Sequence, residues 1–177
     1  NAPRWVFDLD RVRWGYPDAP MRNRLVFAVC DERGQVVFAS GRSILSGHEP
    51  KYLYPSSVAA GCGKSDVVDN LDVWVNCPRL LLCEGGLSAL SCGAGGIASL
   101  GMGLSEMKAA RIASAAPGEV VLLQEPEMSD ALAEDTARKL QVLGVPVRIG
   151  RLVNGDPNDD PEQVEGVVAE ARAASLF

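Results

Sequence analysis

Residues 79–101 read RLLLCEGGLSALSCGAGGIASLG, and this stretch decides the fold. The apolar run over residues 79–83 is short, does not alternate with polar residues and ends at Glu84, which is typical of a fully buried parallel strand. Two glycines then provide a tight turn, and residues 87–92 predict the start of a helix. Residues 97–100 predict a second short strand. The stretch therefore predicts the order strand, helix, strand.

The same alternation continues toward the C-terminus. Periodic apolar residues and turn glycines predict further strands and helices in strict succession. Such an order predicts an α/β fold with a mainly parallel sheet flanked by helices. The expected strands are residues 119–123 and 145–152, and the expected helices are residues 106–115, 130–143 and 162–174.

The N-terminal part has a different pattern. Apolar runs at residues 25–29 and 36–40, joined by a polar turn, predict a β-hairpin. Residues 46–70 are rich in polar residues, glycine and proline, and we expect a loop region there. We therefore divide the chain into a small basic β-hairpin subdomain, residues 1–78, and an α/β domain, residues 79–177.

Composition limits the classes of function. The net charge is −6 and 47% of the residues are hydrophobic, so the chain can bury a sizeable core. The acidic balance argues against a general basic nucleic-acid binder, but not against binding through a local basic strip. The one histidine, His48, nearly excludes a histidine-based triad or metal site.

The cysteines and the chain start indicate the setting. The five cysteines are odd in number and show no CxxC spacing, so we expect free thiols in a reducing cytoplasm. No signal peptide and no apolar run long enough to span a membrane is evident. The chain starts with Asn1 rather than Met, which fits an excised or processed piece.

Acidic residues follow three of the expected strands. Because ligands of open parallel sheets bind at the carboxyl ends of strands, we expect these side chains to gather at one edge. Carboxylate oxygens suit Mg²⁺ or Mn²⁺, which support phosphoryl transfer. From spacing alone, the alternative that these are solvated loop residues stays open. The candidates are Glu84, Glu125, Glu127, Asp156 and Asp159.

Several motifs resemble one family. Residues 82–90, LCEGGLSAL, followed by ASLG at 98–101, resemble the glutamate motif of Toprim domains, and more narrowly that of DnaG-type DNA primases of bacteria and phages. Residues 22–27 resemble the basic strand entry of those primases, and Pro50-Lys51-Tyr52-Leu53 resembles their lysine-bearing loop. The acidic pair after the third strand falls where the family has Asp-x-Asp, and residues 156–159 resemble its final acidic turn. The likeness runs from about Met21 to Glu162.

The resemblance implies a Toprim fold and RNA primer synthesis on a single-stranded DNA template from ribonucleoside triphosphates. Glu84 would be the central catalytic residue and a metal ligand, and the other acids would hold Mg²⁺ or Mn²⁺. A replicative helicase or other replisome protein would be a partner, in the cytoplasm of a bacterium or phage-infected host and without a membrane. The residues expected to bind nucleic acid or nucleotide phosphates are Arg22, Arg24, Arg42, Lys51 and Lys64.

The sequence also departs from this family. Glu125-Pro126-Glu127 replaces Asp-x-Asp, and Ser88 stands where the family has an aspartate. The zinc-binding module and helicase-binding region of such primases are not recognised here, so template selection would depend on other parts or partners. Two alternatives therefore remain. One is a degenerate Toprim module that binds nucleic acid or a replication partner without catalysis. The other is a Toprim nuclease or topoisomerase-like enzyme, which residues 22–53 argue against.

Overall fold

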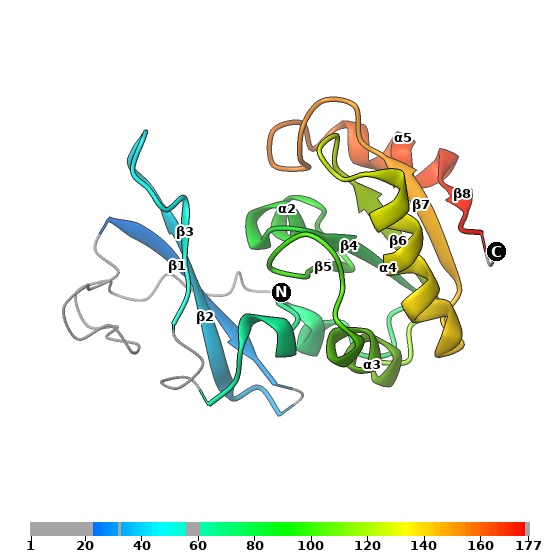
Figure 1. Ribbon diagram of the computed structural model, residues 1–177, viewed down its shortest axis with the longest axis horizontal. Coiled ribbons are helices and arrows are strands. Elements are labelled where there is room, and N and C mark those ends of the chain that lie inside the picture. The colour runs from blue at the N-terminus through cyan, green and yellow to red at the C-terminus, as the bar shows by residue number, and fades with distance from the viewer. Residues whose placement is uncertain (1–22, 32, 56–60, 176–177) are drawn as a thin grey trace. The chain divides into compact units, whose positions relative to one another are not determined.

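The structure is a computed structural model that describes residues 23–31, 33–55 and 61–175 (Figure 1). The chain divides into two compact units, Asn1–Val67 and Val68–Phe177. The sequence predicts a domain boundary after residue 78, and this stays a prediction. Val68 and Leu71 are buried in the core of the C-terminal unit, and Trp74 packs against it.

The N-terminal unit contains a three-stranded antiparallel sheet in the order β1-β2-β3. The expected hairpin is confirmed, and it buries Phe38 and Val29 completely. A third strand lies in the region expected to be a loop. Its residues Tyr52 and Leu53 pair with Arg42 and Gly41 of the second strand. The strands are β1 (Arg24–Cys30), β2 (Val36–Ser43) and β3 (Tyr52–Leu53).

The C-terminal unit is built on a five-stranded sheet in the order β5-β4-β6-β7-β8. The first four of these strands are parallel, which confirms the expected α/β alternation. Their carboxyl ends therefore lie at one edge of the sheet. The strands are β4 (Arg79–Cys83), β5 (Gly96–Ala98), β6 (Glu119–Gln124), β7 (Val147–Arg151) and β8 (Arg172–Ala173).

The last strand corrects one expectation. The helix predicted over residues 162–174 ends at Glu170, and the chain then turns back along the sheet. Ala173 pairs with Arg148 and Arg172 pairs with Ile149, so β8 is an antiparallel edge strand. The last residues of a short helix gain little from staying helical. Pairing with the sheet edge is more favourable, because it satisfies the backbone N–H and C=O groups of that edge.

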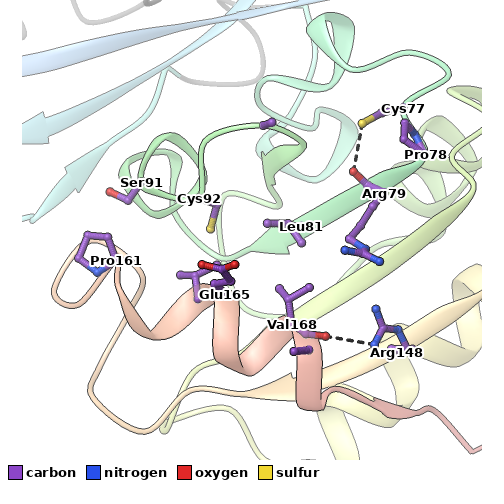
Figure 2. A pocket seen from close by; sticks show the side chains of 13 residues that line it. Cys77, Pro78, Arg79, Leu81, Ser91, Cys92, Arg148, Pro161, Glu165 and Val168 are labelled. Atoms are coloured by element: carbon purple, nitrogen blue, oxygen red, sulfur yellow. Dashed lines mark hydrogen bonds between the residues drawn. The ribbon is translucent and has the colours of Figure 1, made fainter.

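Alternate residues of each strand face opposite sides of the sheet. One side carries Leu81, Val121 and Leu123, which pack with Val164 and Val168 of α5. This cover is thin, and a cavity of about 730 Å³ remains there (Figure 2). The helices of the unit are α2 (Gly86–Ser91), α3 (Glu106–Ser114), α4 (Asp130–Val142) and α5 (Gln163–Glu170).

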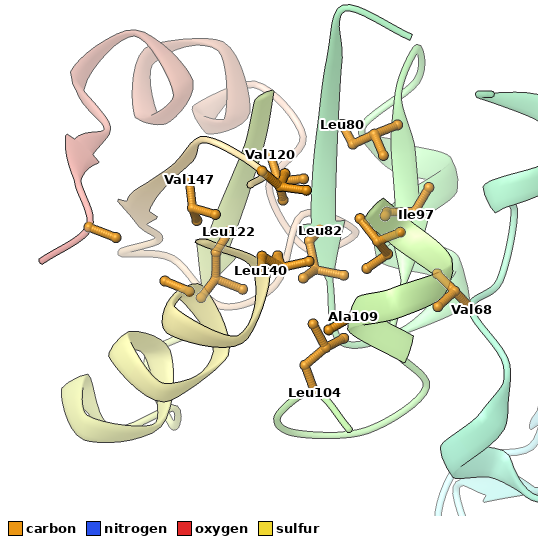
Figure 3. Close-up of a cluster of buried hydrophobic side chains, with 14 of the residues drawn as sticks. Val68, Leu80, Leu82, Ile97, Leu104, Ala109, Val120, Leu122, Leu140 and Val147 are labelled. Carbon is orange, nitrogen blue, oxygen red and sulfur yellow. The ribbon is translucent and has the colours of Figure 1, made fainter. Parts of the chain in front are cut away.

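The other side of the sheet carries the larger core (Figure 3). Leu80 and Leu82 of β4 pack there with Val120 of β6, and helices α3 and α4 cover them through Ile112 and Leu140. These five side chains are essentially inaccessible to solvent. Because Val, Leu, Ile and Ala fill this core, the low aromatic content of the chain does not prevent close packing. None of the described helices is long and apolar enough to cross a membrane.

Candidate functional site

Two parallel strands bring Glu84 and Glu125 together. Strand β4 pairs with β6 in register, with Leu82 opposite Leu122, and each glutamate directly follows its strand. The backbone beside Glu84 is fixed by Gly101, whose N–H donates to the Glu84 carbonyl oxygen at 3.2 Å. The carboxylate of Glu125 accepts a hydrogen bond from the Glu84 backbone. The two residues thus hold each other at the carboxyl edge of the sheet.

Glu125 is the electrostatic centre of this edge. Burial raises its pKa most, followed by the negative charges of Glu84, Asp156 and Glu127, and together they bring it from an ordinary value near 4.5 to about 7. The hydrogen bond from the Glu84 backbone acts against this shift but does not cancel it. Nearby like charges disfavour the charged form of a carboxyl group. We call Glu125 and the three residues whose charges act on it, Glu84, Glu127 and Asp156, the acidic cluster.

The fifth acid, Asp159, has a different place. Asp156 Oδ1 accepts hydrogen bonds from the backbone N–H of Asn158 at 2.8 Å and of Asp159 at 3.2 Å. This turn holds the Asp156 side chain, whereas the exposed Asp159 carboxylate lies against Gly155. Gly155 adopts φ +77°, and a Cβ there would come within 2.8 Å of Asp159 Oδ2. Asp159 lies on the same loop as Asp156, but it is not among the charges that act on Glu125.

The acidic cluster suits a hard divalent cation by its chemistry. All four side chains offer carboxylate oxygens, the ligands that Mg²⁺ and Mn²⁺ prefer. Their mutual repulsion, seen at Glu125, is what a bound cation would relieve. Over residues 23–31, 33–55 and 61–175, however, no three acidic, histidine or cysteine side chains are arranged to hold a metal ion. The carboxylates thus lie at one edge of the sheet but do not form a complete metal coordination sphere.

Buried polar residues support this edge, and the sequence did not indicate them. Gln124, which is 2% exposed, donates from Nε2 to the Met128 carbonyl and to Asp130 Oδ1, and so shapes the turn that carries Glu127. Lys108 of α3 is 4% exposed, and its ammonium group donates to the Ser99 carbonyl. A lysine on an otherwise amphipathic helix resembles a solvated residue in sequence, so no pattern distinguished it.

The expected basic residues lie in the N-terminal unit and differ in their surroundings. Arg22 lies outside the described residues. Arg24 is 3% exposed, and its Nη1 donates to the carbonyl oxygens of Gly41 at 3.1 Å and Lys51 at 3.4 Å. These contacts join β1 to the chain that leads into β3. The described contacts of Arg24 are therefore internal, and a phosphate-binding role for it stays a prediction.

Arg42 and Lys51 line one pocket. This pocket has a volume of about 320 Å³ and is also lined by Ser43, His48 and Glu49. Ser43 Oγ lies 2.9 Å from His48 Nδ1, and Glu49 accepts a hydrogen bond from the Lys51 backbone at 3.0 Å. Two cationic side chains thus border a single polar pocket.

Arg42 also begins a row of cations and aromatic rings. Its guanidinium lies 5.2 Å from the centroid of the Tyr52 ring, which stacks on Tyr54 with centroids 6.3 Å apart. At the other end, Lys64 Nζ lies 5.0 Å from the Tyr54 centroid. We call Arg42, Tyr52, Tyr54 and Lys64 the basic–aromatic row. Tyr54 is not among the binding residues that the sequence predicts, because no sequence pattern indicates its stacking on Tyr52.

Comparisons with known proteins identify the fold. No protein-family model and no curated protein matches the sequence. Among solved structures, a DnaG primase catalytic domain bound to single-stranded DNA is 24% identical, with a TM-score of 0.70, over 88% of this chain and 54% of its own. The E. coli primase catalytic core is 23% identical, with a TM-score of 0.69, over 86% and 53%.

A third similar structure is the RNA polymerase domain of Mycobacterium tuberculosis primase DnaG in complex with double-stranded DNA. It is 19% identical, with a TM-score of 0.66, over 85% of this chain and 54% of its own. The chain therefore has the fold of DnaG primase catalytic cores, as its motifs indicated. It spans about half the length of these structures.

Proposed function

We propose that this chain is the catalytic core of a DNA primase, which synthesises RNA primers on single-stranded DNA. The observation that carries the proposal is the acidic cluster around Glu125, placed at the carboxyl ends of parallel strands in a fold shared with DnaG catalytic cores. Primer synthesis transfers a nucleotidyl group, and that chemistry depends mainly on positioning and on neutralising phosphate charge. A gathering of carboxylates serves this purpose when it holds divalent metal.

Glu84, Glu125, Glu127 and Asp156 would hold the Mg²⁺ or Mn²⁺, which neutralises phosphate charge when bound. The protein's own contribution is to fix these carboxylates before the substrate arrives. The Glu84 backbone fixes the Glu125 carboxylate, and the turn at Asp156 fixes the third strand end. Glu84 is the residue whose loss we expect to be most damaging, either as a ligand or as the acid–base group.

The N-terminal unit would bind the template and nucleotides. Stacked tyrosines beside cations are a common way to hold single-stranded nucleic acid, because every base has a π-face and every linkage a phosphate. Tyr52 and Tyr54 would stack on bases, and Lys64 would contact the backbone. Arg42 and Lys51, which line one pocket, would bind phosphates. The net charge of −6 is compatible with this, since the basic residues are locally grouped.

A second candidate function is a module that binds single-stranded DNA or a replication partner without synthesis. Ser88 favours it, because this buried, uncharged side chain on α2 stands where the family has an aspartate. Glu125-Pro126-Glu127 also favours it, since glutamates place their carboxylates one methylene farther out than aspartates. Such a module would keep the basic–aromatic row and dispense with metal.

One experiment separates these functions. The 177-residue chain, and any longer protein that contains it, would be given single-stranded DNA, ribonucleoside triphosphates and either Mg²⁺ or Mn²⁺. Primer products that disappear in the Glu84→Gln variant would support the primase. Binding of DNA without incorporation under either metal, by both the chain and the longer protein, would support the binding module. Cleavage of DNA in the absence of nucleotides would point to a nuclease and overturn the proposal.

A further inference from the structure

Two cysteines that are nine residues apart in the sequence meet inside the C-terminal unit. The Sγ atoms of Cys83 and Cys92 lie 3.4 Å apart and share a hydrogen bond. We propose that Cys83 and Cys92 form an oxidation site, at which a peroxide converts the thiol pair into an intramolecular disulfide. This proposal is independent of primase activity, because it rests on the sulfur geometry alone.

The fold holds both sulfurs in place. Cys83 is the last residue of β4 and is 2% exposed, among the apolar side chains that include Leu81 and Val121. Cys92 is the C-cap of α2 and packs against the same cluster. A disulfide has an S–S length of about 2.05 Å, so the two sulfur atoms, now 3.4 Å apart, must approach each other by about 1.35 Å. Cys92 lies at the end of a short helix, and rotation of its side chain can supply such a movement.

Oxidant can reach the pair from one side. Cys92 is partly exposed and lines the cavity of about 730 Å³ between α2 and α5 (Figure 2). Cys77 lines the same cavity, but its thiol donates to the Arg79 carbonyl at 3.1 Å instead of facing another sulfur. Cys92 is therefore the accessible thiol that has a buried thiol in contact.

The chemistry balances with hydrogen peroxide as the oxidant. The Cys92 sulfur, as thiolate, attacks one peroxide oxygen; an S–O bond forms, the O–O bond breaks, and the departing hydroxide takes a proton to become water. The Cys83 sulfur then attacks Cys92 Sγ; the S–S bond forms, the S–O bond breaks, and the hydroxyl leaves as water with the Cys83 proton. Two thiols and one peroxide thus give one disulfide and two waters.

The surroundings favour a disulfide over a metal thiolate site. A structural zinc site needs four ligands, usually cysteine and histidine. In the part of the chain that the structure describes, no third cysteine, histidine or acid joins Cys83 and Cys92 in a metal-holding group. The carbonyl oxygen of Cys83 instead accepts hydrogen bonds from the backbone N–H and the hydroxyl of Ser99. Oxidation would thus join the end of α2 to a firmly held strand end.

The test is oxidation of the folded chain followed by mapping of its thiols. Limited hydrogen peroxide is added, free thiols are alkylated under denaturing conditions, and peptides are analysed by mass spectrometry. We expect loss of two of the five free thiols and recovery of a peptide pair linked through Cys83 and Cys92, which dithiothreitol reverses. Oxidised chains in which Cys83 is still alkylated, or in which the linked pairs are intermolecular or involve other cysteines, would overturn the proposal.

Two variants provide the controls. Cys77→Ser removes the other thiol of the cavity, and the Cys83–Cys92 linkage should form to the same extent. Cys92→Ser removes the accessible partner, and Cys83 should then remain fully alkylatable after peroxide treatment. If Cys92→Ser fails to fold, the unmodified chain still decides the matter, because the linked peptide is either recovered or not. Oxidation of Cys83 in the folded Cys92→Ser variant at an undiminished level would count against the pair.

Discussion

The carboxylate of Glu125 accepts a hydrogen bond from the backbone of Glu84, which lies at the end of the neighbouring parallel strand. This hydrogen bond lowers the pKa of Glu125, but burial and the charges of Glu84, Asp156 and Glu127 raise it by more. The pKa of Glu125 is therefore about 7. The fold therefore stores electrostatic repulsion at this edge of the sheet. Binding of a cation, protonation of Glu125 or removal of its charge by mutation would each reduce this repulsion.

Replacing Glu125 with glutamine should stabilise the protein at neutral and alkaline pH. The folded-state pKa is raised, so folding favours the protonated acid, and wild-type stability falls as pH rises from about 4.5 through about 7. Glu125→Gln does not ionise and escapes this loss. After allowance for partial exposure and solvent screening, we expect a gain on the order of 1–2 kcal/mol at pH 8, and almost none at pH 4.5.

Urea unfolding between pH 4.5 and pH 8 measures this difference. Glu170→Gln is the matched control, because Glu170 is an exposed glutamate at the end of α5. Because this side chain is exposed, its replacement should change stability by less than Glu125→Gln does at pH 8. A Glu125→Gln variant that is equally or less stable than wild type across the whole range would show that the repulsion at this edge is absent.

Divalent cations should lower the pKa of Glu125 if the acidic cluster binds them. A cation among the four carboxylates favours the charged form of each, opposing the repulsion that now raises this pKa to about 7. The measurement is a pH titration of the Glu125 carboxyl carbon by NMR, with and without Mg²⁺, with NaCl added to equal ionic strength. An identical titration curve under both conditions would contradict metal binding by the cluster.

Much of this edge could be predicted from the sequence, because its signals are local. Glu84 directly follows an apolar run, and Glu125 follows a second apolar run after Gln124, so parallel pairing brings the two strand ends together without further information. The likeness of residues 82–90 to a primase motif points to the same place, and the chain has the fold of DnaG catalytic cores. A single segment of sequence is enough to show that an acidic residue follows a strand.

Other features depend on contacts between distant residues and could not be predicted. The sequence predicts phosphate binding for Arg24, which stays a prediction, but it does not indicate that pairing of β1 with β2 turns the guanidinium onto the Gly41 carbonyl. The contact of Cys83 with Cys92 requires α2 to fold back along β4, which cysteine spacing does not indicate. Tyr54 belongs to a row of rings and cations that exists only once β3 has formed. In each case the sequence does not indicate which distant residue the side chain contacts.

Tyr54→Leu should weaken binding of single-stranded DNA if the basic–aromatic row is a stacking surface. Loss of one base–aromatic stack typically costs about 1–3 kcal/mol, which corresponds to a Kd increase of roughly 5- to 150-fold. Fluorescence anisotropy with a labelled oligonucleotide at fixed salt measures the change. Arg33→Gln is the control, because it removes a charge from the hairpin turn of the same unit. Equal effects of the two variants would contradict a specific stacking role.

Arg148→Met should cost about 2 kcal/mol of stability, as loss of charged hydrogen bonds usually does. Arg148 donates to both carboxylate oxygens of Glu119, at 3.0 and 3.1 Å, and to the Val168 carbonyl at 3.1 Å. Arg79, which binds the same carboxylate, is half exposed, so Arg79→Met should cost less than about 1 kcal/mol. Chemical denaturation compares the two, and a larger loss for Arg79→Met would refute this ranking.

The Arg148 effect should also depend on pH. Hydrogen bonding to Arg148 holds the pKa of Glu119 below its ordinary value near 4.5. A lowered folded-state pKa contributes stability that is present above pH 4.5 and is lost as the carboxylate becomes protonated at lower pH. The difference between wild type and Arg148→Met should therefore shrink on acidification. A difference that stays constant down to pH 3 would indicate that the contacts of Arg148 with α5 dominate.

Gly96→Ala should be far more damaging than Gly93→Ala, although the two glycines lie in one turn. A Cβ on Gly96 would overlap the carbonyl oxygen of Ala89, so strand β5 and helix α2 would have to separate, at a cost of about 3 kcal/mol or more. Gly93 adopts φ +69° with no atom near its Cβ position, and alanine there carries only the left-handed backbone penalty of about 1 kcal/mol. Thermal unfolding of both variants measures the gap, and equal losses would show that α2 and β5 do not approach so closely.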